Sequence, residues 1–574
     1  MKKLSLLFIF FYIGAFSQTY ITDVTVADVE NRKMIPNRTV VIKDGVISDI
    51  LSASTKIPSN AVIVNGKGKF LMPGLVDSHV HFFQSGGLYT RPDAIDLRQF
   101  KPYETERTQS KDNMGKNLRR YLQNGITTVI DPGTTISFLK KRQDFATDVY
   151  APTLFMSGPL LTTYEPEAYK GLGDDAPFNL MASPEDARNW VRKQLPFKPD
   201  FIKIWFIIEN GSDAEAGARK NLESVKAAID EAHSHNLKVA VHATERITAQ
   251  LAVENGCDYL VHSIEDEVLS DNFIKLLKKK KTILCPTLAV AEGYAATFGQ
   301  RLNPSEHVLR TSDPHQLGSL FDLRHLPDTT RINSIKRQVT SEKFLQNSQR
   351  NSGILLQNLK KLSDAGIVIA TGTDAGNNGT LHASSYLDEV LLMRKSGMGN
   401  WKILQASTIN GAKVLDKQGE FGSISKGKKA NLILLDANPS ENIENLTRIY
   451  RVINKGVVLD PKEILVESPS DLVQRQLNAY NARNIEAFLD TYSDDVELFI
   501  FPSKSIGKGK EAMRKTYEAM FQQTPNLHCE ILGRIVQGNV VIDKESVRFG
   551  DQKLEAVAVY HIENGKIAKV YFIE

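Results

Sequence analysis

Short apolar runs alternate with amphipathic segments through the middle of this 574-residue chain, and this alternation constrains the fold more than any other feature. One amphipathic segment opens with Ser183, Pro184, Glu185 and Asp186, which supply a helix N-cap, a first-turn proline and first-turn acids. The apolar runs are GLVDSHVHF, GITTVIDPG, APTLFMSG, DFIKIWFI, LKVAVHA, DYLVHSIE, TILCPTLA and GIVIATGTDAG. Eight buried strands that alternate with helices predict an α/β fold, a (β/α)8 TIM barrel over residues 73–415. A doubly wound open sheet is the alternative, although no glycine-rich dinucleotide loop follows any run.

Strand-like segments lie on both sides of the barrel region. Residues 19–70 alternate apolar and polar side chains between turn signals, and the same texture returns at 422–439 and 449–460. Two β segments that bracket a large middle region suggest one small domain built from both. We therefore expect a composite β-sandwich from residues 18–72 and 416–466.

The last hundred residues have the character of a separate domain. The polar stretch 467–470 is typical of a linker, and the sequence after it is helical up to Tyr492. Alternating runs follow, with a hairpin turn at Asn564 and Gly565. Residues 470–574 are therefore predicted to form an α+β domain.

The first twenty residues have the composition of a secretory signal. Two lysines precede an apolar run, and Ala15, Phe16 and Ser17 give a small-residue cleavage pattern before Gln18. A buried first strand or a membrane anchor is the alternative, but the run is shorter than the ~20 residues that a membrane span requires. We expect residues 1–17 to be a cleaved signal peptide, which predicts a periplasmic or secreted protein with no stable membrane anchor after cleavage.

Charge and cysteine content narrow the classes of partner. The chain has 71 basic and 67 acidic residues, a formal net charge of +4, and its basic run KLLKKKK is typical of a solvated helix end. Nucleic acid is therefore not implied as a partner. The three scattered cysteines, Cys257, Cys285 and Cys529, predict neither a disulfide framework nor a zinc site.

Two His-x-His pairs occur, and only one of them fits a metal site. His79 and His81 follow the first apolar run, and residues two apart in a strand face the same side. His233 and His235 lie at the end of a predicted helix, where residues two apart diverge by about 200°. The first pair can therefore bind one ion together, whereas the second is expected to lie near a helix C-terminus, where positive charge is tolerated.

Active sites of barrels lie at the carboxyl ends of the strands, which gives a test of the first pair. Four more potential ligands fall at or just beyond the ends of later runs: Lys203, His242, His262 and Asp374. Any one of them alone would more often be an ordinary polar residue. Six on one rim are hard to attribute to chance, and they indicate a metal site.

Several motifs together resemble the metal-dependent amidohydrolase superfamily, in particular its imidazolonepropionase-like and prolidase-like branch. They extend over residues 19–460 and are PGLVDSHVHF, NGITTVIDPG, FIKIW, VAVHA, LVHS, GTDAG and GSISKGKKANLILLDANP. The resemblance implies a (β/α)8 barrel flanked by a small β-sandwich, and two divalent metal ions. The resemblance implies that the first ion is bound by His79, His81 and Asp374. It implies that the second is bound by His242 and His262.

Lys203 has a special place in the ligand set that the resemblance implies. Carboxylated by carbon dioxide, Lys203 would bridge the two ions, because a carbamate offers two oxygens that span ions ~3.5–4 Å apart. An unmodified lysine paired with a carboxylate is the alternative. Zinc suits imidazole and carboxylate ligands, with manganese, iron or nickel as other choices.

The implied chemistry is hydrolysis of an amide by a metal-bound hydroxide, formed because the ions lower the pKa of water toward ~7. Asp374 would accept a proton from that water and deliver it to the leaving nitrogen. His382 follows Asp374 closely and is a second catalytic candidate as a substrate contact, although a role as a surface or helix-entry residue is equally compatible with the sequence.

The expected substrate is a small-molecule amide. Family members that deaminate or open imidazolone rings generally lack Lys203, so a dipeptide of Xaa-Pro type or an N-acyl amino acid is favoured, with an imidazolonepropionase-like cyclic amide hydrolase as the alternative. A long insert at 290–350 has the length of a lid. Its Arg301, Arg310 and Arg324 are candidates to bind a substrate carboxylate, or else solvated surface charges.

The C-terminal region resembles the SnoaL-like, ketosteroid-isomerase-like cone fold through QLNAYNARNIEAFLDTYSDDVELF, GKGKEAMRKTYEAMF and HIENGKIAKVYFIE. Such a cone encloses a pocket, with Tyr480, Asp494 and Asp495 as candidates for its mouth, and implies no active residues. In fused proteins the domain more often dimerises or binds a small molecule, so a homo-oligomer through this domain is expected. An exported, non-catalytic binding or assembly protein that works through the cone is the remaining alternative.

Overall fold

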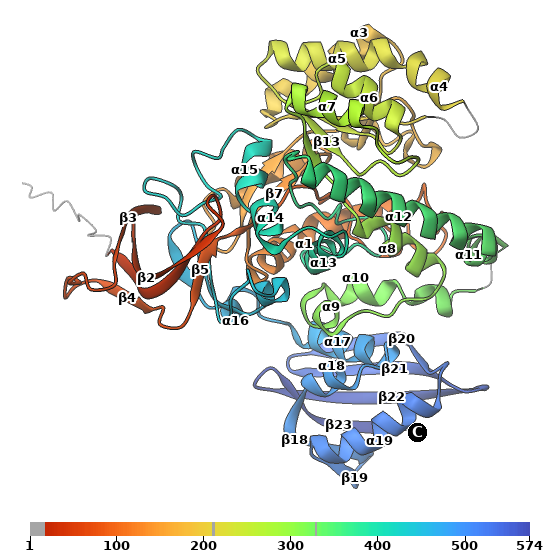
Figure 1. The fold of residues 1–574 in the computed structure, drawn as a ribbon. Coiled ribbons are helices and arrows are strands. Elements are labelled where there is room, and N and C mark those ends of the chain that lie inside the picture. Colours follow the sequence, from red (N-terminus) through yellow and green to blue (C-terminus); the bar gives the residue numbers. More distant parts are fainter. Residues whose placement is uncertain (1–17, 209–212, 328–329, 574) are drawn as a thin grey trace, which may run out of the picture.

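The eight apolar runs form the wall of a closed barrel (Figure 1). The computed structural model describes residues 18–208, 213–327 and 330–573. Neighbouring wall strands pair in parallel, as buried strands joined by helices must. Seven of the runs contain strands: β6 (Leu75–Asp77), β7 (Ile126–Asp131), β8 (Thr153–Met156), β11 (Ile202–Trp205), β12 (Val239–His242), β13 (Tyr259–Val261) and β14 (Ile283–Cys285).

The wall departs from regular strands in two places. The third strand is interrupted, because β8 pairs with β7, whereas β9 (Leu160–Thr162) pairs with β11 and, at its outer edge, with β10 (Phe178–Leu180). The eighth run is extended backbone in which Ile369 bridges Leu284 of β14. The barrel then closes where the N–H of Asp374 donates to the carbonyl of His79 and the N–H of His81 to that of Ala375, both at 2.7 Å. We call this contact between segments 78–81 and 371–375 the closure seam.

Amphipathic helices cover the outside of the barrel. Helix α3 (Pro184–Gln194) begins as predicted, since the Ser183 hydroxyl accepts from the Asp186 N–H at 3.1 Å and Pro184 occupies the first position. The buried faces of the helices join the strands in one apolar core. The other covering helices are α1 (Tyr103–Gln123), α5 (Leu222–Ser234), α6 (Arg246–Glu254), α7 (Asp271–Lys280), α12 (Glu342–Asp364), α13 (Ser385–Lys395), α14 (Asn400–Ala406) and α15 (Ile409–Val414).

Beside the barrel lies an eight-stranded sheet built from both ends of the barrel sequence (Figure 1). Its order is β17-β16-β15-β5-β1-β2-β3, with β4 beside β1, and the antiparallel pair β5 and β15 joins the two ends. The strands form one hydrogen-bonded network around a shared apolar core that includes Val24, Ile42, Leu434 and Ile453. The bounds are β1 (Thr19–Asp28), β2 (Lys33–Lys43), β3 (Val46–Ser52), β4 (Val62–Asn65), β5 (Phe70–Pro73), β15 (Leu432–Leu435), β16 (Ile449–Asn454) and β17 (Val457–Leu459).

The insert after β14 packs against the C-terminal domain instead of forming a simple lid over the barrel. In Figure 1, α9 and α10 lie between the barrel and α17 and α18. They lie there because Leu309 and Leu317 of the insert share a buried cluster with Leu472 and Val473 of the C-terminal domain. From the insert, Val290 and Tyr294 of α8 line the cavity at the barrel mouth. The insert helices are α8 (Ala289–Phe298), α9 (Glu306–Thr311), α10 (Pro314–Ser319) and α11 (Thr330–Thr340).

The C-terminal domain packs three helices against a six-stranded sheet of order β19-β18-β23-β22-β21-β20. The stretch predicted to be a linker starts α17: the Ser468 hydroxyl and the Asp471 carboxylate form a capping box. A cavity of about 730 Å³ lies inside the domain and is lined by Tyr480, whereas Asp494 is not among the described residues that line it. The bounds are α17 (Pro469–Asn481), α18 (Ile485–Asp490), α19 (Lys510–Gln523), β18 (Tyr492–Ile500), β19 (Lys504–Lys508), β20 (His528–Gln537), β21 (Val540–Phe549), β22 (Gln552–Glu563) and β23 (Lys566–Ile573).

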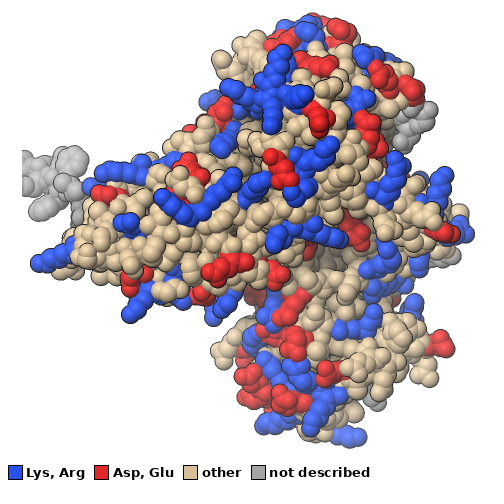
Figure 2. All heavy atoms as spheres, in the orientation of Figure 1, with Lys and Arg blue, Asp and Glu red and all other residues tan. Residues whose placement is uncertain are grey.

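The surface carries both signs of charge, interspersed over the face shown in Figure 2. The three cysteines are buried free thiols. Within the part of the chain that the structure describes, no helix has the length and apolar character needed to cross a membrane. The predicted signal peptide, residues 1–17, lies outside the described residues.

Candidate active site

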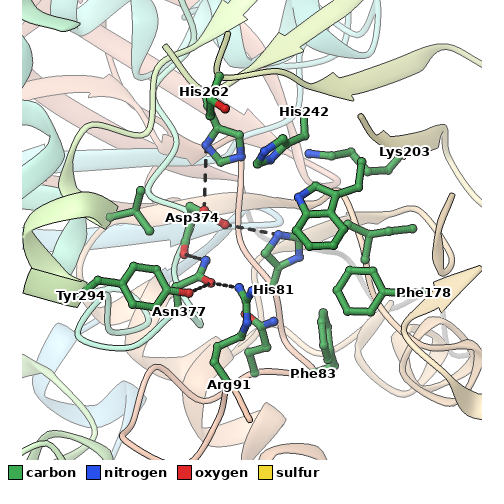
Figure 3. Close-up of a pocket in the computed structure, with 15 residues that line it drawn as sticks. His81, Phe83, Arg91, Phe178, Lys203, His242, His262, Tyr294, Asp374 and Asn377 are labelled. Atoms are coloured by element: carbon green, nitrogen blue, oxygen red, sulfur yellow. Dashed lines mark hydrogen bonds and ion pairs between the residues drawn. The ribbon is translucent and has the colours of Figure 1, made fainter. Parts of the chain in front are cut away.

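The six predicted ligands converge at the carboxyl end of the barrel, because parallel strands deliver the side chains at their ends to one rim. Figure 3 shows His81, Lys203, His242, His262 and Asp374 of this set. Five of them are buried, and His242 is half-buried. Their positions are His79 and His81 just after β6, Lys203 within β11, His242 at the end of β12, His262 just after β13 and Asp374 near the end of the eighth run.

Three ligand atoms form a tight triangle. The Nε2 atoms of His79 and His81 lie 3.1 Å apart, and Asp374 Oδ1 lies 3.3 Å from each of them. This carboxylate oxygen is buried and has no hydrogen-bond partner among the described residues. Separations of this size are those of neighbouring ligands around one ion held at ~2.0–2.2 Å. The triangle therefore fits a divalent cation, whose binding would satisfy the orphaned oxygen.

A second group of ligands lies on the other side of Asp374. The rings of His242 and His262 are T-shaped, with centroids 4.2 Å apart, and the His262 ring lies 5.2 Å from that of His79. His262 Nδ1 is 4.0 Å from the second carboxylate oxygen of Asp374. Lys203 lies beside His242 and lines the same cavity (Figure 3). The aspartate thus faces both groups of imidazoles, one oxygen toward each.

Burial keeps three of the imidazoles neutral. It lowers the pKa of His79, His242 and His262 well below the usual value, and the positive charge of Lys203 adds to the effect. Burial also lowers the pKa of Lys203, to about 8, against the attraction of Asp374. The site therefore offers imidazoles in the form that binds metal ions and a lysine that loses its proton more readily than a solvated one.

Protein groups behind the ligands orient their rings. His81 Nδ1 donates to the Gly133 carbonyl at 2.7 Å and lies 3.6 Å from Asp131. Burial opposes a charge on His81, but the nearby carboxylates of Asp131 and Asp374 raise its pKa to about 9. His262 Nδ1 bonds the Thr287 hydroxyl at 2.6 Å. Such partners leave the other nitrogen of each ring free to bind an ion.

Two buried carboxylates behind the site were not recognised from the sequence. Asp131, the last residue of β7, accepts from the N–H groups of Phe82 and Gly133 at 3.0 and 3.1 Å. Asp77, the last residue of β6, accepts from the N–H and hydroxyl of Thr373 at 3.0 and 2.8 Å. Burial raises the pKa of both, that of Asp77 to about 7. Both end barrel strands, so the positional signal that identified the ligands also applies to them.

Two ligands have left-handed backbone. His262 has φ 76° and Asp374 has φ 58°, conformations that few non-glycine residues adopt. At Asp374 the closure-seam hydrogen bond to His79 holds this conformation. Residues held in such conformations by their surroundings cluster at functional sites, where they aim a side chain that a relaxed backbone would direct elsewhere.

The candidate ligands open into a cavity of about 230 Å³ that has an aromatic wall and, apart from Lys203, the basic side chain of Arg91 (Figure 3). Phe83, Phe178 and Trp205 line one part of it. Arg91 lies opposite Lys203 in Figure 3 and was not recognised from the sequence, because it sits in a loop with no periodic pattern. The cavity can therefore receive a small substrate with an apolar group and an anionic group.

Neighbouring side chains fix Arg91 in this wall. Its Nε donates to Asp93 at 2.8 Å, and its Nη1 donates to the side-chain oxygen of Asn377. Tyr294 of α8 donates to the same Asn377 oxygen at 2.8 Å. Asp93 also accepts from the Tyr169 hydroxyl at 2.7 Å. The guanidinium is therefore preorganised.

His382, the second catalytic candidate, is not among the described residues that line the cavity. Its Nδ1 accepts from the Tyr121 hydroxyl at 3.0 Å, its Nε2 donates to the Gln84 carbonyl at 2.8 Å, and its ring stacks on Phe82. Both nitrogens are thus engaged with protein groups, and the structure does not bring His382 to the substrate side. It supports the loop at Gln84 instead.

The insert arginines are placed elsewhere too. Arg301, Arg310 and Arg324 are not among the described residues that line the cavity. Arg310 pairs with Glu306 at 2.7 Å, and Arg324 lies over the Phe321 ring. They are directed away from the ligands because the insert folds toward the C-terminal domain.

The second His-x-His pair lies at the end of α5, away from the six ligands. His233 Nε2 is 2.9 Å from Asp258, and His235 Nε2 is 3.1 Å from Glu231. Both histidines are exposed. Each therefore has its own surface carboxylate, in line with the divergence expected for residues two apart near a helix end.

Comparisons with known proteins match two regions of the chain to known families. The model of the amidohydrolase family matches residues 70–459, and that of the SnoaL-like domain matches residues 473–570. A 5-methylthioadenosine/S-adenosylhomocysteine deaminase of Acetivibrio thermocellus is 28% identical, over 78% of this chain and 91% of its own. An imidazolonepropionase of Clostridium tetani is 23% identical, over 71% of this chain and 86% of its own.

Solved structures share the fold. A Xaa-Pro dipeptidase with bound methionine has a TM-score of 0.60 at 22% identity, covering 77% of this chain and all of its own. The ochratoxinase of A. niger has a TM-score of 0.57 at 19% identity, covering 77% of this chain and 96% of its own. With more than half of its length matched by one family model, the chain belongs to the amidohydrolase family, as a hydrolase of C–N bonds with a SnoaL-like domain at its C-terminal end.

Proposed function

We propose that the protein is an exported, metal-dependent hydrolase that cleaves the amide bond of a small substrate with a free carboxylate, such as a Xaa-Pro dipeptide or an N-acyl amino acid. The observation that carries the proposal is a single cavity in which the clustered ligands face a preorganised arginine. The fold shared with a Xaa-Pro dipeptidase is compatible with this substrate class.

The donor set supports two divalent ions, most simply zinc. The triangle around Asp374 Oδ1 would hold the first, and His242 with His262 would hold the second. Bound there, such ions supply a water of lowered pKa and polarise the substrate carbonyl.

Lys203 is suited to bridge the ions after carboxylation. Its buried amine has a pKa lowered to about 8, so a sizeable fraction is neutral near that pH. The neutral nitrogen attacks carbon dioxide, an N–C bond forms, and one proton leaves to solvent. The product is an anionic carbamate, which replaces a buried cation by a ligand with two oxygens.

Asp374 is placed to move the proton that amide hydrolysis requires. Its carboxylate lies between the two groups of imidazoles, and its pKa is lowered despite burial, because His81 and His262 stabilise the charge. It is therefore ionised at neutral pH and can accept a proton from the attacking water. It can then deliver that proton to the nitrogen that leaves.

Arg91 and the aromatic wall would select the substrate. The guanidinium pairs with Asp93 through Nε and Nη2, and its remaining N–H groups can donate to a substrate carboxylate, while Phe83, Phe178 and Trp205 contact an apolar group. This places the carboxylate on the Arg91 side of the cavity and the scissile amide nearer the ligands.

A cyclic amide hydrolase of imidazolonepropionase type is the second candidate. Relatives of that name match about 70% of the chain. Lys203 in the cavity favours the first candidate, because a bridging carbamate is useful only to a pair of ions.

Export and assembly are further parts of the proposal. The lysines, apolar run and small-residue pattern of residues 1–17 support export. Exposed apolar side chains on the sheet of the C-terminal domain, such as Ile535 at 65% and Leu554 at 63%, support association of two copies through it. Mass measurement of the mature chain tests the first point, and the mass of the assembly in solution tests the second.

The central test is hydrolysis of a panel by protein loaded with zinc and bicarbonate, together with its metal content. Dipeptides and N-acyl amino acids should be cleaved, and about two ions per chain should be found. In Lys203→Ala both should fall, whereas the surface variant Lys238→Ala should match wild type. Cleavage of cyclic amides alone would favour the second candidate, and no stoichiometric metal would overturn the proposal.

A further inference from the structure

The loop formed by residues 83–91, called here the active-site loop, has one face on the catalytic cavity and another on the C-terminal domain. Phe83, Gln84 and Arg91 line the catalytic cavity. Between them, the carbonyls of Gly87 and Leu88 accept from the Asn378 side chain at 2.8 and 2.9 Å. The loop is thus held on its barrel side by residues adjacent to the site.

On its other face the loop reaches a second cavity of about 340 Å³, which lies between the insert and the C-terminal domain. Tyr89 lines this interdomain cavity, and its hydroxyl donates to Asp322 Oδ2 at 2.8 Å. The Leu88 N–H donates to the Ser319 hydroxyl at 3.0 Å. Tyr89 lies two residues before Arg91, so the position of the loop at this point depends on insert residues.

A pair of histidines connects those insert residues to the C-terminal domain. His325 Nδ1 lies 3.0 Å from Nε2 of His528, the first residue of β20. The other nitrogen of His325 faces two carboxylates, Asp322 at 3.7 Å and Glu530 at 4.0 Å. A continuous series of polar contacts thus runs from His528 through His325 and Asp322 to Tyr89.

The geometry of this pair is that of a hydrogen bond and not of a shared cation. Two imidazoles that point their nitrogens at one shared ion are tilted toward each other, whereas two that share one hydrogen bond point straight at each other. At the same N···N distance, the ring centroids are therefore closer in the first arrangement than in the second. His79 and His81, at 3.1 Å between nitrogens, have centroids 4.9 Å apart. His325 and His528, at 3.0 Å, have centroids 5.3 Å apart. The interdomain pair therefore meets nearly head to head.

The surroundings also fix the direction of that hydrogen bond. A proton on His325 Nε2 faces the carboxylates of Asp322 and Glu530, which favours this tautomer. Its Nδ1 is then an acceptor, and His528 Nε2–H is the donor. Burial lowers the pKa of both imidazoles, so both are neutral at pH 7 and only one proton lies between them.

The insert and the C-terminal domain pack together, so a shift of one shifts the other. Phe321, next to Asp322, shares a buried apolar cluster with Leu472 and Val473 of the C-terminal domain. The Asn478 side chain donates to the Pro314 carbonyl at 2.7 Å. Displacement of β20 would therefore displace the insert residues that hold Tyr89.

We propose that the C-terminal domain supports the active site of the barrel, with His528 as a positioning residue that acts through His325 and Asp322 on Tyr89 and so fixes the active-site loop. This gives the fused domain a role in the reaction without any contact with the substrate. The effect on loop mobility stands by itself, whereas the effect on kinetics rests on the proposed function.

The test compares variants of the zinc-loaded full chain by hydrogen exchange of residues 83–91. His528→Leu and Tyr89→Phe each remove one contact of the series and should speed exchange about threefold to tenfold, the effect of losing one hydrogen bond. His528→Gln keeps an N–H donor at the same reach and should restore wild-type exchange. The matched control is His315→Leu, because His315 lies 3.2 Å from Asp471 across the same interface but outside the series.

Kinetics and a double variant separate positioning from general loss of stability. His528→Leu should raise KM for carboxylate substrates about threefold to tenfold, with a smaller change in kcat, and His315→Leu should leave both unchanged. The double variant Tyr89→Phe/His528→Leu should show no faster exchange and no higher KM than either single variant, because both substitutions break the same series of contacts. Wild-type exchange in His528→Leu, or equal acceleration in His315→Leu, would overturn the inference. If wild type cleaves no amide, the proposed function fails, and exchange still decides this point.

Discussion

At the scale of single residues, we expect substrate choice to depend on Arg91, whose guanidinium Asp93 and Asn377 hold in place. We expect Arg91→Met to raise KM for N-acyl amino acids about 10- to 100-fold, since a charge-assisted hydrogen bond contributes ~1.5–3 kcal/mol. Initial rates measured over a range of substrate concentrations check this. The same substrates with the carboxylate converted to an amide are the control, and their KM should differ little between wild type and Arg91→Met. An equal rise in KM for the acids and for the amides would assign Arg91 a structural role only.

A buried carboxyl in the C-terminal domain gives a pH-dependent prediction. Burial raises the pKa of Glu545 to about 7, although the Tyr560 hydroxyl donates to it at 2.9 Å. The folded state therefore binds the proton more tightly than the unfolded state. The stability this contributes is fully present below the unfolded pKa near 4.5 and is lost as pH rises toward 7.

Glu545→Gln should remove this pH dependence and be more stable than wild type at pH 8, by at most about 3 kcal/mol from a shift of this size. At pH 4 the two should be nearly equal. Urea unfolding at both pH values measures the difference, with exposed Glu555→Gln as the control. A variant that is less stable than wild type at pH 8 would show that the charged form is favoured in the folded protein.

At the scale of secondary structure elements, α17 depends on its N-terminal cap. The Ser468 hydroxyl accepts from the Asp471 N–H at 3.1 Å, and the Asp471 carboxylate accepts from the Ser468 N–H at 3.1 Å. We expect Ser468→Ala to destabilise the protein by about 0.5–2 kcal/mol. Chemical denaturation followed by circular dichroism checks this, and Ser470→Ala, inside the helix start, should cost less. Equal losses in the two variants would argue that the cap contributes nothing particular.

Residues at strand ends could be placed from the sequence, whereas residues in loops and in the insert could not. The convergence of the six candidate ligands could be predicted because a barrel strand delivers its end residues to one rim, a rule that depends only on local pattern. Arg91, by contrast, lies in a loop, and the direction of the insert depends on tertiary contacts of Leu309 and Leu317 that no period reveals. The sequence left two roles open for His382 for the same reason, since the Tyr121 and Gln84 contacts that hold it outside the cavity lining come from distant segments.

At the scale of the whole molecule, the candidate metal site lies where the barrel closes. His79 and His81 lie on one side of the closure seam and Asp374 on the other, joined by backbone hydrogen bonds of 2.7 Å. The eighth run contributes only isolated bridges to the wall. An ion held by side chains from both sides would therefore cross-link the barrel where its wall is least regular.

Removal of metal should then weaken the whole barrel and not the site alone. Ions that bind only the folded state stabilise it by about 2.7 kcal/mol when free metal is 100 times Kd. We expect a chelator to lower Tm by several degrees and to speed hydrogen exchange in residues 78–84 and 371–381 more than around β12 and β13. Zinc with bicarbonate should reverse both changes. The surface pair variant His233→Ala controls for weak metal binding elsewhere and should respond as wild type does. If chelation changed neither Tm nor exchange while metal was shown to leave, the ligands would not act as a cross-link of the seam.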